Sequence, residues 1–282
     1  MHKLSMLMTA VCLSVSGTAA VAQQASSSAY GVSANENVAA AGVINANVSV
    51  GPISQAAGTA PPPYNNSSTI ASASQNAALT TGITGVTQGL QTDVLTSNAS
   101  GTSTGAQATA TVNNLQLTES QAGILTSLLG LDATTIQSHS EASSVGGLSA
   151  SGSTTIEGLT LYGLLTNGLT IDGSLYVNPA PNTVLLSIAG LSIILNEQTM
   201  LGDGVNSLGI STNAIDVAFN NFALGTNVLN GNIIVGHSQA LASLGQAAAV
   251  PEPSTWALML FGFAGIGLVT RRRRTRPLMQ LA

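Results

Sequence analysis

Hydrophobic and polar residues alternate along much of this chain, which is the period-two pattern of strands that bury one face. In Val43–Val50, isoleucine, alanine and valine alternate with asparagine and serine, and Ala29–Ser33 is a shorter candidate strand. Gln107–Leu117 also alternates, with an interruption at Asn113-Asn114 that predicts a turn or bulge. The pattern therefore predicts strands in the first half of the chain.

The strand signal is strongest after Thr154, where β-branched residues are frequent and Gly, Asn, Asp and Pro separate the segments. Many short strands with turn residues between them favour a β-sandwich. We therefore predict an all-β fold, with a β-rich body over residues 23–240. The strands expected in this part are Thr154–Tyr162, Gly168–Val177, Thr183–Gln198, Ser207–Phe222 and Asn230–Gly236.

Other segments carry weaker signals. Gln55–Gln75 has few large apolar residues and three consecutive prolines, so we expect a Pro/Ser-rich loop. Thr80–Ser97 fits a helix or a strand, and its glycines favour the strand. Thr118, with Gln three residues later, makes a weak capping box and predicts a short helix within Thr118–Leu131. Ala133–Val145 returns to the alternation of a strand.

The N-terminus has the three parts of a secretory signal peptide. Lys3 lies in a short basic region, Leu4–Gly17 is apolar, and Ala20 and Ala22 form a small-x-small cleavage site. Residues 1–22 are thus expected to be removed, and the mature chain to begin at Gln23. Removal of this segment also removes the only cysteine, so the body has neither a disulfide nor a thiol nucleophile.

Charge is distributed unevenly. All 6 lysine and arginine residues lie at the two ends of the chain, and none lies between Gln23 and Ala249. All but one of the 11 acids lie in that interval, the exception being Glu252. A body without cations cannot hold phosphate backbones, so we expect no nucleic-acid binding.

The C-terminus follows a different plan. A small-residue linker at 241–249 leads to Val250-Pro251-Glu252-Pro253-Ser254, where the prolines favour an extended backbone. Trp256–Thr270 carries no charge and predicts a transmembrane helix about 22 Å long, against a hydrocarbon core of about 30 Å. Arg271-Arg272-Arg273-Arg274 then provide a positive membrane stop within residues 271–276.

These three parts, over residues 250–276, resemble the PEP-CTERM sorting signal of Gram-negative bacteria. The resemblance implies that exosortase, a membrane-embedded cysteine protease, recognises the Pro-Glu-Pro motif and cleaves near it. The protein would first be anchored in the inner membrane with a periplasmic body, and later reach the cell surface or the medium. The alternative is a plain C-terminal transmembrane anchor without processing.

Three short motifs in the body resemble the choice-of-anchor P family. They are Ala29-Tyr30-Gly31-Val32-Ser33, Leu195-Asn196-Glu197-Gln198 and Gly236-His237-Ser238. The resemblance implies attachment to the cell surface and no known catalytic activity.

Few residues suggest chemistry. Gly236-His237-Ser238-Gln239-Ala240 resembles a nucleophile elbow, but no histidine follows Ser238, as that hydrolase fold would require. His139 and His237 lack the close spacing of zinc ligands. We therefore expect no catalytic residue and no cofactor.

Oxygen ligands for calcium are available at Asp203, Asn206 and Asp216, but these residues lack the spacing of an EF-hand. The acids of the body are typical of solvated turns, so we expect no metal site.

Two functions remain open from the sequence. The first is a non-enzymatic surface or extracellular-matrix protein that exosortase sorts. The alternative is a polysaccharide-binding module, with exopolysaccharide as its partner. Sugar-binding faces usually rely on aromatic side chains. The tyrosines of the body are few: Tyr30, Tyr64, Tyr162 and Tyr176.

Overall fold

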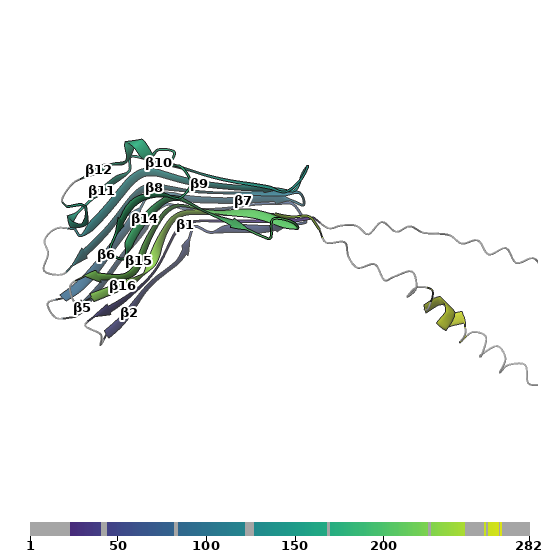
Figure 1. Ribbon diagram of the computed structural model, residues 1–282, viewed down its shortest axis with the longest axis horizontal. Helices are drawn as coiled ribbons and strands as arrows, with labels where there is room; N and C mark the ends of the chain where they lie inside the picture. The colour runs from purple at the N-terminus through teal and green to yellow at the C-terminus, as the bar shows by residue number, and fades with distance from the viewer. Residues whose placement is uncertain are drawn as a thin grey trace, which may run out of the picture. The chain divides into compact units, whose positions relative to one another are not determined.

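The computed structural model shows a protein built mostly of β-strands, in two open antiparallel sheets consistent with a β-sandwich (Figure 1). The predicted all-β fold is thereby confirmed. Ala22–Gly245 forms one compact unit. The described residues are 23–40, 44–81, 84–121, 127–167, 170–224, 227–245, 257, 259–264 and 266.

Sheet I contains the first three strands and the last four. Its order is β13-β14-β15-β16-β1-β2, and β3 also pairs with β1. Its strands are β1 (Gln24–Ala40), β2 (Ile44–Ile53), β3 (Ala56–Ala60), β13 (Thr183–Ile188), β14 (Leu191–Leu201), β15 (Ser207–Leu224) and β16 (Asn227–Ser243).

Sheet II is formed by the middle of the chain. Its order is β12-β11-β9-β8-β6-β5, with β10 on β9 and with β7 joining β4 to β8. Its strands are β4 (Tyr64–Ile70), β5 (Ala73–Thr81), β6 (Thr84–Thr92), β7 (Leu95–Thr102), β8 (Gly105–Gln121), β9 (Leu129–Ser143), β10 (Ser149–Glu157), β11 (Thr160–Tyr162) and β12 (Ile171–Asp172). Two 3₁₀ turns accompany its last strands: η1 (Leu164–Thr166) lies between β11 and β12, and η2 (Gly173–Tyr176) lies between β12 and β13.

The long strands bend near their middles (Figure 1), and the alternation of buried residues changes phase there. In β8, both Val112 and Leu115 are buried, and Asn114 between them has a φ of 49°. The predicted interruption at Asn113-Asn114 is confirmed. In β16 the same change occurs at Gly236, whose φ is 66°. Because several long strands change phase together, each sheet bends as a unit.

The bend separates two kinds of interior. On one side, which we call the leucine half, large side chains form one continuous core. On the other, the alanine–serine half, most buried side chains are small. The leucine half includes Leu90, Leu115, Leu117, Leu131, Ile193, Leu195, Ile215, Val217, Phe219 and Ile233. The alanine–serine half includes Ala25, Ala29, Ala106, Ala108, Ser138, Ser140, Ala142, Thr212, Ser238, Ala240 and Ala242.

Two predicted connections contain strands. The expected loop at 55–75 holds β3, β4 and the start of β5, so that prediction was wrong. The expected linker at 241–249 begins too early, because β16 continues to Ser243, and residues 246–249 lie outside the described residues. In both places the prediction treated the lack of large apolar residues as the lack of a core. In the alanine–serine half, Ala56, Ala60 and Ala242 are fully or almost fully buried.

Two further predicted elements differ from the structure. The helix expected within Thr118–Leu131 is absent from the described residues, since Thr118 and Gln121 belong to β8 and residues 122–126 lie outside the description. The strand pairing of β8 with β6 outweighs the weak capping signal. The strand expected at Gly168–Val177 is reduced to β12 and the turn η2.

The C-terminal segment is described only in part. Ala257, residues 259–264 and Ile266 are helical. Among the described residues, no helix combines the length and the apolarity needed to cross a bilayer. Of the predicted helix at 256–270, residues 256, 258, 265 and 267–270 lie outside the described residues. So do the signal peptide with Ala20 and Ala22, the motif Val250–Ser254 and the arginines 271–274.

Candidate functional site

The three body motifs that stand out in the sequence meet at the bend of sheet I. In the strand register, Tyr30 of β1 lies opposite His237 of β16. His237 lies opposite Asn213 of β15, and Asn213 lies opposite Glu197 of β14. These four residues form a line across four strands, on the face that points away from sheet II. We call this line the outer row.

The outer row is connected from end to end. The rings of Tyr30 and His237 stack, with centroids 4.4 Å apart and planes at 15°. His237 Nδ1 lies 2.7 Å from Asn213 Oδ1, and Asn213 Nδ2 donates to Glu197 Oε2 at 2.7 Å. Because the Asn213 amide presents its oxygen to the imidazole, His237 Nδ1 carries the proton and donates. The Nε2 atom is then the acceptor of the neutral ring.

Burial keeps His237 in this neutral form. It lowers the pKa of His237 to about 4, well below that of a solvated histidine. At neutral pH the His237 end of the row is therefore uncharged.

Asp216 lies beside the outer row and forms a carboxyl pair with Glu197. It points to the outer face of β15, yet it is only 8% exposed. Its cross-strand neighbours are Ile194 and Ile234, which remove water from it. Burial, followed by the charge of Glu197, raises the pKa of Asp216 to about 7. The pair therefore resists holding two negative charges at neutral pH.

Ser238 faces the opposite way from His237. It is 0% exposed and lies between the sheets, where its Oγ is 2.9 Å from Ser140 Oγ of β9. β16 continues past it to Ser243, so the residues immediately after Ser238 form a strand and not a helix. The strand–elbow–helix setting of the hydrolase motif is thus absent at this position, and Ser238 joins the two sheets.

Of the three calcium ligands considered from the sequence, Asp203 and Asn206 are hydrogen-bonded to each other in one turn, but Asp216 lies apart from them. Asp203 lies in the turn before β15 and accepts hydrogen bonds from the backbone N–H groups of Val205, Asn206 and Ser207. These bonds lower its pKa, because they favour the ionised form. Asp216 lies within β15 instead. The prediction of a solvated turn acid is correct for Asp203 and wrong for Asp216.

His139 is also apart from the outer row. Its Nδ1 lies 3.1 Å from Thr109 Oγ1 in the neighbouring strand of sheet II. Within the described ranges, no group of three or more His, Cys, Asp or Glu residues is arranged to hold a metal ion.

Two buried acids were missed in the sequence. Glu36 of β1 and Glu119 of β8 are each 3% exposed and point between the sheets. Burial raises the pKa of Glu36 to about 7. Burial, with the charge of Glu36, also raises the pKa of Glu119. The alternation of the sequence could have revealed the burial of Glu36, because Glu36 lies on the same face of the strand as Ala34 and Val38, which are both buried.

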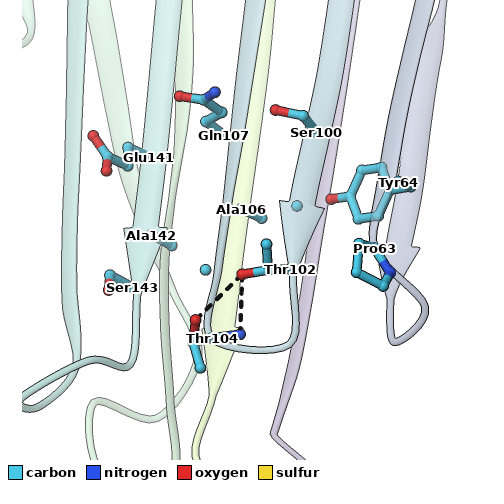
Figure 2. Close-up of a pocket in the computed structure, with 12 residues that line it drawn as sticks. Pro63, Tyr64, Ser100, Thr102, Thr104, Ala106, Gln107, Glu141, Ala142 and Ser143 are labelled. Carbon is cyan, nitrogen blue, oxygen red and sulfur yellow. Dashed lines mark hydrogen bonds between the residues drawn. The ribbon is translucent and has the colours of Figure 1, made fainter.

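A surface hollow of about 340 Å³ lies at the tip of the alanine–serine half (Figure 2). Pro63 and Tyr64 line one side, and Glu141 lies on the other. The Tyr64 hydroxyl is within 2.7 Å of Ser27 Oγ, which fixes its ring. Gln107 also lines the hollow, and the rest of the lining consists of glycines and short side chains such as Thr102.

Comparison with known proteins identifies one segment. Residues 249–274 match the family model of the PEP-CTERM protein-sorting motif. No curated protein and no solved structure matches the chain. The matched segment follows the β body and contains both Val250–Ser254 and the arginines 271–274. The motif implies an exported surface protein that exosortase sorts and processes.

Proposed function

We propose that the protein is a non-enzymatic component of the cell surface or extracellular matrix. Exosortase cleaves the chain near Pro251-Glu252-Pro253 and thereby releases the body from its membrane anchor. The observation that carries this proposal is the sorting-motif match at 249–274, placed directly after a self-contained β body. A plain anchor needs only apolar length and a positive flank. Two prolines around an acid are better suited to recognition by a protease.

The arrangement of the body supports a structural role. Its most reactive candidate, Ser238, is fully buried and bonded to Ser140. Its interior is formed by side chains of the two sheets that pack against each other on both sides of the bend. We expect the purified protein to show no esterase activity above background. Activity that Ser238→Ala abolishes would contradict the non-enzymatic role.

The sorting signal can be tested in the producing cell. Replacement of Pro251, Glu252 and Pro253 by alanine should leave an uncleaved, membrane-retained protein, whereas the mature wild type should lack residues 271–276. Glu157→Ala, at an exposed acid of β10, is the matched control and should be processed normally. Mass spectrometry of the C-terminus separates the outcomes. Equal processing of the triple variant would favour the plain anchor.

The outer row favours a second candidate, the binding of polysaccharide. A stacked aromatic pair beside a planar amide and a carboxylate offers both a flat apolar surface and hydrogen-bonding groups to a sugar ring. Binding to the producer's own exopolysaccharide should fall in Tyr30→Ala. Tyr162→Ala, in sheet II, is the matched control. If both variants bind the polysaccharide as well as the wild type does, the outer row does not take part in polysaccharide binding.

A further inference from the structure

Three oxygen-bearing side chains meet between the sheets in the leucine half. Glu36 comes from β1 of sheet I, whereas Gln88 and Glu119 are cross-strand partners on β6 and β8 of sheet II. Each is only 3% exposed. Gln88 Nε2 donates to Glu36 Oε2 at 2.6 Å, so the amide lies directly against the facing carboxyl. We call these residues the inter-sheet cluster.

Most oxygens of this cluster have no partner. Within the described part of the chain, Glu36 Oε1, Gln88 Oε1 and both carboxyl oxygens of Glu119 lack a hydrogen-bond partner of good geometry, although the Gln88 amide lies close enough to the Glu119 carboxyl to favour its ionised form. Gln75 Oε1 of β5 is also unpartnered. Gln75 pairs with Leu90 of β6, which is two residues from Gln88 on the same strand. Such buried acceptors are strongly unfavourable unless something neutralises and coordinates them.

The protein's own cations do not supply that neutralisation. Between Gln23 and Ala249 the chain contains no lysine or arginine, so no salt bridge from either side chain can form within the body. Neutralisation must come from protons or from a bound cation. The unpartnered oxygens come from both sheets and from an amide as well as from carboxyls. One proton on a carboxyl could be donated to only one of these acceptors, whereas a cation contacts several of them at once, which favours the cation.

We propose that the inter-sheet cluster binds one calcium ion, which links sheet I to sheet II through Glu36, Gln88 and Glu119. All the available ligand atoms are oxygens, the ligands of hard cations. Calcium accepts irregular sets of oxygens and bidentate carboxylates, whereas magnesium requires near-octahedral geometry and retains waters. A buried site with two carboxyls and an amide therefore suits calcium better. The site does not depend on the function proposed above.

Calcium titration of the full exported chain tests the proposal. After treatment with EDTA, calorimetric titration with CaCl2 should give one site per chain, and the ion should raise the Tm. Glu36→Gln and Glu119→Gln each keep the side-chain shape but remove a charge, so both should lose the calcium-dependent rise in Tm. Glu157→Gln, at an exposed acid of β10, is the matched control and should respond like wild type.

Several results would overturn the proposal. One is a wild-type protein whose Tm does not respond to millimolar calcium. Another is a response that survives both glutamine variants, which would place the ion elsewhere. A third outcome is that the cluster holds protons only: calcium would then have no effect, and the glutamine variants would be more stable than wild type at pH 8.

A second measurement does not depend on whether the variants fold. Terbium can replace calcium in the wild-type chain, and its luminescence lifetimes in H2O and D2O count the waters bound to the ion. Few or no bound waters, together with displacement by calcium, are expected for the inter-sheet cluster. A heavily hydrated ion would indicate a surface site and contradict the assignment.

Discussion

The two halves of the sandwich use the same two sheets but are held together differently. In the leucine half, large side chains such as Leu131 and Ile193, both 0% exposed, form one continuous core. In the alanine–serine half, the buried alanines form only small separate clusters. There, Ser140 of sheet II bonds to Thr212 Oγ1 and to the carbonyl oxygen of Ser238, both in sheet I, at 3.0 Å each.

This difference shows that small residues bring the sheets close together. A serine side chain is short, so its bond to the facing main chain requires a narrow gap. A Cβ added at Gly152 of sheet II would lie 2.2 Å from Thr212 Oγ1 of sheet I, which confirms that the gap has no spare room. The leucine half thus depends on apolar area, and the alanine–serine half on close packing and hydrogen bonds.

The largest effect is expected from truncation in the leucine half. Leu131→Ala should lower the free energy of unfolding by about 2–5 kcal/mol, because it removes a fully buried side chain and leaves a cavity. Urea denaturation measures the loss. A loss below about 1 kcal/mol would mean that the large side chains are not the main support of this half.

Enlargement should be the damaging change in the alanine–serine half. Ala240→Val adds volume at a 0% exposed position between the sheets, and we expect a loss of about 1–3 kcal/mol. The same substitution at Ala57, an exposed residue of β3, is the control and should change stability little. If Ala240→Val is as stable as wild type, the narrow gap proposed for this half is wrong.

The sequence predicted the leucine half well and the alanine–serine half poorly. Alternation of large apolar residues is visible in one dimension, and it located most strands after Thr154. The strands at 56–60 and 64–70 consist largely of Ala, Ser, Thr and Asn, so they looked like a loop. Whether such residues are buried depends on the opposite sheet, which the local sequence does not contain.

The candidate site was predictable in its parts but not in its assembly. Tyr30, Glu197 and His237 belonged to motifs that stood out in the sequence. Their alignment depends on the register of four strands and on the bend, which residues far apart determine together. Asn213, which connects the imidazole to the carboxyl, had no sequence signal. Asp216 was mistaken for a solvated acid because its burial comes from neighbouring strands.

Asp216, at the bend between the halves, should make stability depend on pH. Its pKa of about 7 exceeds its usual 3.8, so the folded state holds a proton that the unfolded state releases between those values. Stability from this group therefore falls as pH rises from about 4 to about 7. Relative to wild type, Asp216→Asn should gain stability over that range, by at most about 4 kcal/mol, because each pKa unit corresponds to about 1.4 kcal/mol.

The difference in stability between wild type and Asp216→Asn separates the effect of Asp216 from that of His237. The lowered pKa of His237, about 4, has the opposite sign and makes stability rise between about pH 4 and 6.5. Because His237 is present in both proteins, its effect cancels in the difference. Urea denaturation at several pH values measures that difference, and a constant value across the range would contradict the buried carboxyl pair.

The smallest expected effect concerns the hydrogen bonds that cross the gap in the alanine–serine half. Ser238→Ala removes the hydroxyl that lies 2.9 Å from Ser140 Oγ but leaves Ser140 bonded to Thr212 and to the main chain. We therefore expect a loss of about 1 kcal/mol, the usual value of one such bond. Ser140→Ala removes every one of these bonds and should cost more. In the double variant the two losses should not add, because the hydroxyls of Ser140 and Ser238 share one interaction. Additive losses would show that these serines act only by being small, and that close packing alone holds this half together.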